Sequence, residues 1–101
     1  TVAHVGSKVA VTSFNFNDEE QLVLNNIMNS CNNTVIGKPW YAGDHAVFAF
    51  GGTKCILISA SDLFEGCLSY THCPKDTIDL VDKKLIENAA DFICKFVNSY
   101  I

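Results

Sequence analysis

The chain is 101 residues long, 49% hydrophobic and 18% charged, with a formal net charge of −4 at pH 7. We therefore expect one small domain with a single core, residues 1–101, and the apolar content excludes intrinsic disorder. The seven basic residues are all lysines and are scattered, which excludes a nucleic-acid-binding face because such a face needs clustered positive charge.

The N-terminal third predicts a strand and a helix. Residues 1–7 are weakly patterned and are expected to form a loose lead-in, whereas residues 8–14 alternate with β-branched side chains and predict a first strand. Asn17 or Asp18 then begins a helix that runs to about Ser30, because carboxylates fill its first turn. Its apolar stripe has helical spacing and comprises Leu24, Ile27, Met28 and Cys31.

An exposed turn and a short strand follow this helix. Polar residues and Gly37 surround a short β-rich stretch, residues 34–36. The turn contains the single sequon of the chain, in which Asn32 is the glycosylation candidate of a secreted protein. Trp40 and Tyr41 come next, and such a pair packs most often in a core or at a sheet edge, with an interface or ligand-stacking role as the alternative.

Residues 45–60 predict a β-hairpin around which the rest of the chain is organised. Two β-rich runs flank Gly51-Gly52, and adjacent glycines supply the positive φ angles of a two-residue hairpin turn. In that register Val47, Ile56 and Ile58 share one face of the hairpin. Because both faces are apolar, we expect helices to cover one face and these three side chains to look outward.

The C-terminal part predicts a second, stronger helix over residues 77–98, after a cysteine-containing connection at 61–75. Asp76 or Thr77 is a suitable cap for this helix. Its apolar stripe comprises Val81, Leu85, Ala89, Phe92, Ile93 and Phe96. Together these elements predict an α+β fold, a two-layer α/β sandwich in which an antiparallel sheet of three to four strands carries two helices on one face.

Five cysteines in a chain this short predict a disulfide framework in an oxidising compartment, with cytosolic buried thiols as the alternative. They are Cys31, Cys55, Cys67, Cys73 and Cys94. Our preference is for a bond between Cys67 and Cys73 and another from Cys94 to Cys31 or Cys55, while the odd thiol is either free or bonded to a second chain. The chain begins at Thr1 without Met, as expected of a processed mature form.

No catalytic or metal constellation stands out in the sequence. A thiol nucleophile with its base is suggested by Cys55 and His45, but the hairpin register places their side chains on opposite faces. The cysteines and histidines lack zinc-ligand spacing, so we expect no metal and no cofactor. The chain is therefore expected not to be an enzyme.

The span from about Trp40 to Phe96 resembles the small secreted fungal killer toxins and related necrosis-inducing effectors. The resemblance rests on the stretches 43–47, 52–58 and 79–81, the last opening an amphipathic helix that ends near Cys94. It implies a disulfide-stabilised α/β sandwich that is released from a precursor and harms competing or host cells at their surface. Among such toxins the chain is similar to the acidic, yeast-type members, for which the resemblance implies membrane activity.

Two functions are expected from these observations. The first is a secreted, extracellular toxin that disturbs a target cell membrane or engages a cell-surface receptor through Val47, Ile56 and Ile58, with Trp40 and Tyr41 beside them. The alternative is a secreted fungal effector whose apolar sheet face binds a partner protein, a second chain or its own copy without membrane activity. Nucleic acid is not an expected partner.

Overall fold

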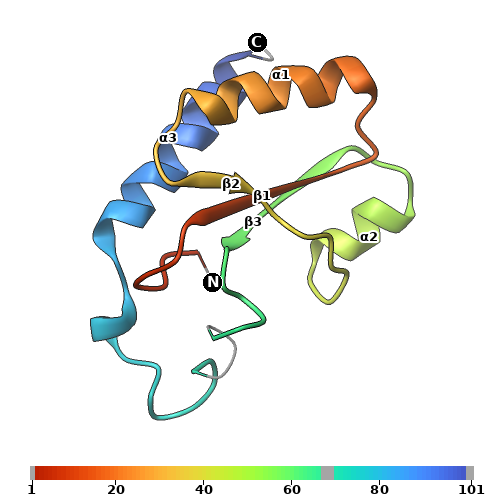
Figure 1. The fold of residues 1–101 in the computed structure, drawn as a ribbon. Coiled ribbons are helices and arrows are strands. Elements are labelled where there is room, and N and C mark those ends of the chain that lie inside the picture. Colours follow the sequence, from red (N-terminus) through yellow and green to blue (C-terminus); the bar gives the residue numbers. More distant parts are fainter. Residues whose placement is uncertain (1, 67–69, 100–101) are drawn as a thin grey trace.

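The computed structural model describes residues 2–66 and 70–99 (Figure 1). The strands are Val9–Phe14 (β1), Thr34–Ile36 (β2) and Cys55–Ala60 (β3), and the α-helices are Asp18–Asn29 (α1), His45–Phe50 (α2) and Lys83–Ser99 (α3). A 3-10 turn at Ile78–Leu80 precedes α3. The chain is thus a small α+β domain with a three-stranded sheet, as the sequence predicted at that level.

The sheet is mixed, which corrects the prediction of an antiparallel sheet. Its strand order is β2-β1-β3, with β1 parallel to β2 and antiparallel to β3. Two neighbouring parallel strands need a crossover connection, and α1 supplies it between β1 and β2. The helix predicted from the sequence therefore dictates the parallel pairing of the short strand that follows it.

One face of the sheet is covered by α1 and α3 and contains the main core (Figure 1). The buried members of this core come from β1, α1 and α3 and are Val9, Val11, Leu24, Met28, Leu85, Ala89 and Phe92. Each helix presents residues spaced by three or four, which places them on one side of the helix. The two long helices were predicted for this role.

The helix α1 begins as the sequence indicates, with a capping box. The backbone N–H of Glu20 donates to Oδ1 of Asn17 at 2.8 Å, and the backbone N–H of Asn17 donates to Oε1 of Glu20 at 3.1 Å. Two of the N–H groups that a helix start leaves without a partner are satisfied in this way. Asp18 and Glu19 add negative charge where the helix dipole favours it.

The predicted hairpin is wrong in its first half, because residues 45–50 form α2. Gly52 has a φ of 79°, the backbone N–H of Thr53 donates to the Phe48 carbonyl, and that of Gly52 donates to the Ala49 carbonyl. These bonds are those of a Schellman motif, in which a glycine with positive φ ends a helix. The glycine pair thus provides a helix C-cap instead of a hairpin turn, and only the second half of the predicted hairpin is a strand.

Ile56 and Ile58 lie on the helix-covered face, which corrects their predicted outward orientation. Ile58 pairs with Val11 and Ile56 with Ser13, and directly opposed residues share a face of the sheet. Both isoleucines are half-buried and pack against the main core. They are therefore separated from Val47, which is exposed on α2.

The helix α3 starts at Lys83, six residues after the predicted start. The residues before it are paired with the N-terminal segment instead: the N–H of Val5 donates to the Leu80 carbonyl at 2.8 Å, and the N–H of Asp82 donates to the Ala3 carbonyl at 2.7 Å. The predicted loose lead-in is thereby fixed against the start of α3. Oδ1 of Asp82 then accepts the N–H of Lys84 at 2.9 Å and caps the helix.

No disulfide bond is seen among the described residues. Cys31, Cys55 and Cys94 carry free thiols, so the preferred bond from Cys94 to Cys31 or Cys55 is not formed. Cys94 is exposed on α3, whereas Cys31 packs against the main core. Cys67 lies outside the described residues, and its predicted bond to Cys73 stays a prediction.

Candidate functional site

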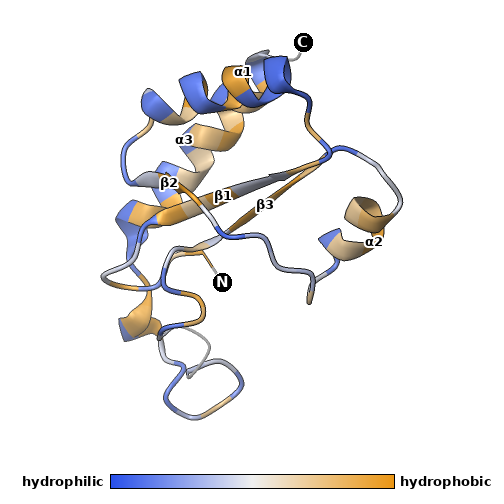
Figure 2. Ribbon diagram, turned by 45° about the vertical axis from the view of Figure 1, so that its right-hand side comes forward, coloured by the Kyte–Doolittle hydropathy of each residue, from blue (hydrophilic) through white to orange (hydrophobic). Residues whose placement is uncertain are grey.

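Several large apolar side chains on α2, and one just before it, are exposed to solvent. Val47 is 77% exposed, Phe50 74%, Phe48 55% and the neighbouring Tyr41 50%. None of the α2 residues is buried, and Figure 2 shows this helix as a largely hydrophobic segment set apart from the other two helices. We call the surface formed by Tyr41, Val47, Phe48 and Phe50 the α2 surface.

A ladder of aromatic rings attaches the α2 surface to the second face of the sheet. The ring of Phe14, buried at the end of β1, lies 5.4 Å from that of Tyr41 and 5.3 Å from that of His45. The ring of Tyr41 in turn stacks on that of Phe50 at 4.9 Å. Ring contacts at these centroid distances are favourable, so the exposed rings rest on a buried one.

The ladder continues through Trp40, which is half-buried. Its ring lies 5.0 Å from that of His45 and 6.0 Å from that of Phe64, in both cases edge to face. Nε2 of His45 lies 2.5 Å from the Trp40 carbonyl oxygen, and because a carbonyl only accepts, this nitrogen is the donor. Trp40 and Tyr41 thus contact His45 and Phe50 of α2, the helix that carries Val47.

The side chain of Asn15 fastens the C-terminal end of α2. Its Nδ2 donates to the carbonyl oxygens of Ala49 at 2.9 Å and Thr53 at 3.0 Å. Asn15 has a φ of 64°, a left-handed conformation that asparagine tolerates better than most residues. The turn between β1 and α1 thus holds a segment that lies more than 30 residues further along the chain.

A second attachment follows directly after α2. Nζ of Lys54 lies 2.7 Å from Oε2 of Glu20 in the first turn of α1. The hydrogen bond from Lys54, followed by that from the backbone N–H of Asn17, lowers the pKa of the Glu20 carboxyl from its ordinary value. Asn15 and Glu20 together therefore fix the exit of α2 at two points.

The pair of Cys55 and His45 is closer than the sequence predicted, because the hairpin that separated the two residues is absent. The Cys55 thiol lies 4.0 Å from the backbone carbonyl of His45. The imidazole of His45, however, uses Nε2 to bind the Trp40 carbonyl. The thiol thus faces a peptide oxygen, and the arrangement is not that of a nucleophile with its base.

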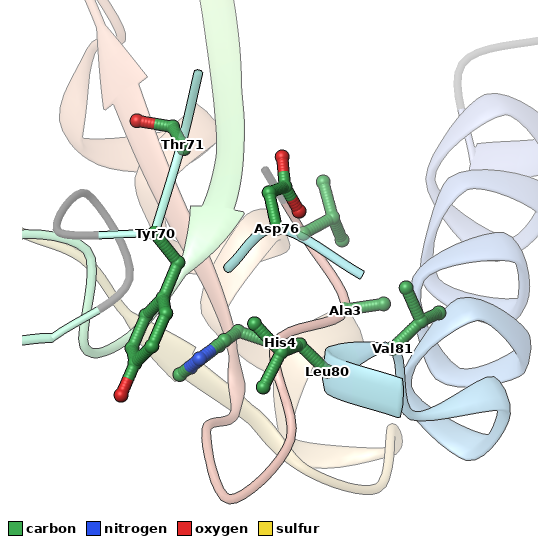
Figure 3. Close-up of a pocket in the computed structure, with 8 residues that line it drawn as sticks. Ala3, His4, Tyr70, Thr71, Asp76, Leu80 and Val81 are labelled. Carbon is green, nitrogen blue, oxygen red and sulfur yellow. The ribbon is translucent and has the colours of Figure 1, made fainter. Parts of the chain in front are cut away.

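A separate pocket of about 200 Å³ lies between the N-terminal segment and the segment before α3 (Figure 3). His4 and Tyr70 line this pocket with ring centroids 5.7 Å apart, as Figure 3 shows for the two side chains. Nδ1 of His4 lies 2.9 Å from Oδ2 of Asp62. Nε2 of His4 and Oδ1 of Asp62 are buried and have no hydrogen-bond partner among the described residues. The pair joins the N-terminal segment to the segment that follows β3.

Three further properties bear on function. Within residues 2–66 and 70–99, no group of three or more His, Cys, Asp or Glu side chains is arranged to hold a metal ion. In the same part of the chain, every helix is too short or too polar to cross a membrane. Asn32, the glycosylation candidate, is exposed in the turn before β2.

The sequence missed Phe48 and Phe50 as members of the α2 surface, and Phe64 as a ring contact of Trp40. The hairpin prediction places Phe48 and Phe50 in its first strand, on the face opposite Val47, Ile56 and Ile58, which helices were expected to cover. The signal that was available is the helix-ending glycine pair combined with two alanines between the large residues, since alanine favours helix. No protein-family profile, curated protein or solved structure matches the chain.

Proposed function

We propose that the chain is a secreted, toxin-like protein that acts at the surface of a target cell membrane by burying the α2 surface in the lipid headgroup region. The observation that carries this proposal is the exposure of four large apolar side chains, Tyr41, Val47, Phe48 and Phe50, on and beside one short helix. An exposed apolar patch of this kind is typical of an interaction site. The proposal involves binding and no chemical step, cofactor or metal.

The α2 surface is suited to this role because it is already ordered before it binds. Asn15 holds the end of α2 through two hydrogen bonds, and the buried ring of Phe14 supports Tyr41 from beneath. A surface that is ordered in advance loses less conformational entropy on binding. Aromatic side chains such as Trp40 and Tyr41 are also favoured at the boundary between lipid and water.

Charge predicts which lipids the surface prefers. The chain carries a formal net charge of −4 at pH 7, so an anionic membrane repels it. We therefore expect stronger binding to zwitterionic phosphatidylcholine vesicles than to vesicles that contain phosphatidylserine. The exposed sequon residue Asn32 supports the secreted setting.

The test uses Trp40, the single tryptophan of the chain, as a fluorescent reporter beside the α2 surface. Titration with phosphatidylcholine vesicles is expected to shift its emission to shorter wavelength and to release an entrapped dye. Val47→Glu combined with Phe50→Glu is expected to weaken binding at least about tenfold, because burial of each side chain contributes about 1.5–3 kcal/mol.

The matched control is Leu22→Glu, which changes a side chain of similar size that is exposed on α1. This variant is expected to bind vesicles like the unmodified protein, apart from the small effect of one added charge. Equal vesicle binding by the double α2 variant and the unmodified chain would contradict the proposal.

A second candidate function is docking onto a protein, as expected of a secreted effector without membrane activity. The observation in its favour is the set of rigidly supported aromatic rings on the α2 surface, since aromatic anchors dominate the binding energy of many protein interfaces. If the fluorescence emission of Trp40 does not shift with any vesicle composition, the result would favour this function. We also propose that the fold is a two-layer α/β sandwich, because α1 and α3 share one face of the sheet.

A further inference from the structure

The outer edge of β3 carries backbone groups that are oriented away from the sheet. The N–H of Val9 donates to the Asn33 carbonyl, and the Val11 carbonyl accepts the N–H of Gly37, so these two β1 residues point toward β2. Residues that alternate with them point toward β3 and pair there with Cys55, Leu57 and Ser59. The N–H and C=O groups of Ile56 and Ile58 therefore face outward, and no described residue makes a backbone hydrogen bond to them.

This edge lacks the features that usually prevent an edge strand from pairing with another chain. The sequence of β3 is Cys-Ile-Leu-Ile-Ser-Ala, without a charged residue or proline. Its pairing with β1 runs without a bulge over all six residues. Surface hollows lie beside this edge: Ile56 lines one of about 290 Å³, and Ile58 lines one of about 300 Å³ that Trp40 and His45 also line.

A stripe of exposed apolar side chains on α3 lies on the same side of the domain. Asn88 and Lys95 of α3 face the α1–β2 side, because Oδ1 of Asn88 accepts from Asn33 at 2.9 Å and Nζ of Lys95 donates to the Ser30 carbonyl at 3.0 Å. About half a turn around the helix from them come large apolar side chains that are roughly half exposed. They are Ile86, Ile93 and Val97.

We infer that a second copy of this chain occupies this edge, with its β3 antiparallel to the first and related to it by a two-fold axis. In the register that uses the outward groups, Ile58 lies opposite Ile58 of the other copy and exchanges two backbone hydrogen bonds with it. The two sheets then form one continuous six-stranded sheet, and the α3 stripes meet above it. The site is distinct from the α2 surface and does not depend on the function proposed for it.

The chemistry of the edge selects this occupant. Lipid hydrocarbon offers no hydrogen-bond partner to backbone N–H and C=O groups, so a membrane cannot satisfy them. An added β-strand does, and a two-fold axis requires only that the patch match itself. The carboxylate of Asp91 pairs with Lys95, which faces the α1–β2 side of α3, so this negative charge is directed away from the stripe.

Sedimentation velocity over a range of protein concentrations tests the inference. The unmodified chain is expected to pass from 11.1 kDa toward twice that mass as its concentration rises. Ile93→Glu combined with Val97→Glu is expected to raise the dissociation constant at least about tenfold, because the new carboxylates face one another across the axis. The control Val47→Glu lies on the α2 surface and is expected to leave the dimer unchanged.

Amide hydrogen exchange then distinguishes strand pairing from contact through α3 alone. The amides of Ile56 and Ile58 are expected to become protected as protein concentration rises, whereas those of Leu57 and Ser59 are protected at every concentration by β1. A mass of 11.1 kDa at all concentrations, or a dimer with no added protection at Ile56 and Ile58, overturns the inference. Neither result decides the vesicle experiment, which tests the side chains of the α2 surface.

Discussion

The two faces of the sheet are built in different ways. The helix-covered face is held by burial: Phe92, Leu24 and Val11 are almost inaccessible to solvent and come from three elements. The other face is held by a ring ladder and by the hydrogen bonds of Asn15, while its outermost side chains remain in water. The first arrangement is a core that supports the fold, and the second is a platform that keeps apolar groups available for binding.

The largest expected effect on stability comes from a change in the main core. Phe92→Ala is expected to lower the free energy of unfolding by about 3–5 kcal/mol, because it removes a fully buried ring between α3 and the sheet. Val47→Ala, on the α2 surface, is the control and is expected to change stability by less than about 0.5 kcal/mol. Chemical denaturation followed by far-ultraviolet circular dichroism measures both, and similar losses in the two variants would show that the faces do not differ as described.

A change at Asn15, whose side chain holds the end of α2, is expected to destabilise α2 more than the main core. Asn15→Ala removes two hydrogen bonds and places a less suitable residue at a φ of 64°, which predicts a loss of about 2–3 kcal/mol. Asn15→Gly restores the backbone conformation but not the hydrogen bonds, and separates the two contributions.

Hydrogen exchange locates the damage of the Asn15 variants. Amides of α2 are expected to exchange faster, while those of α1 and α3 keep their protection at low denaturant because the main core is untouched. If the amides of α2 kept their protection in Asn15→Ala, the hydrogen bonds from Asn15 would not be what holds α2 in place.

The smallest effect is expected from Glu20, which joins α1 to the segment after α2. Its pKa is lowered in the folded chain, so the carboxylate stabilises the fold above its ordinary pKa of 4.5, and this contribution is lost as the pH falls through the lowered value. Glu20→Gln keeps a capping side chain but removes the charge. The difference in melting temperature between this variant and the unmodified chain is expected to shrink from about pH 6 to pH 3. A constant difference would mean that the ion pair with Lys54 contributes nothing.

Burial patterns made one face predictable from the sequence. The apolar stripes of α1 and α3 and the β-branched run of β1 recur at periods that only one secondary structure satisfies, and the capping box of Asn17 and Glu20 marks a helix start locally. The strand β3 was found for the same reason. The strand pairing was not predicted. The strand β3 pairs with β1 because residues 45–50 form a helix, and the parallel pairing of β2 depends on the path of the whole β1–α1–β2 unit.

The candidate site was only partly predictable. Six residues, His-Ala-Val-Phe-Ala-Phe, fit one and a half helical turns or one strand, and neither period is decisive at that length. The outcome depends on Asn15, which lies about 30 residues away in sequence, and on a glycine pair that suits either a hairpin turn or a helix end. Val47 is exposed, but on a helix and not on the outer face of a hairpin, and Trp40 is half-buried beside this helix.

The most direct test of the α2 surface is a lipid-proximity measurement by nuclear magnetic resonance. The labelled protein is mixed with phosphatidylcholine nanodiscs that carry a paramagnetic headgroup, and signal loss is recorded for each amide. We expect the strongest loss at residues 41–50, with little loss along the α3 stripe at Ile86, Ile93 and Val97. Strongest loss along α3, or no loss anywhere on the chain, would contradict the claim that the α2 surface meets the membrane.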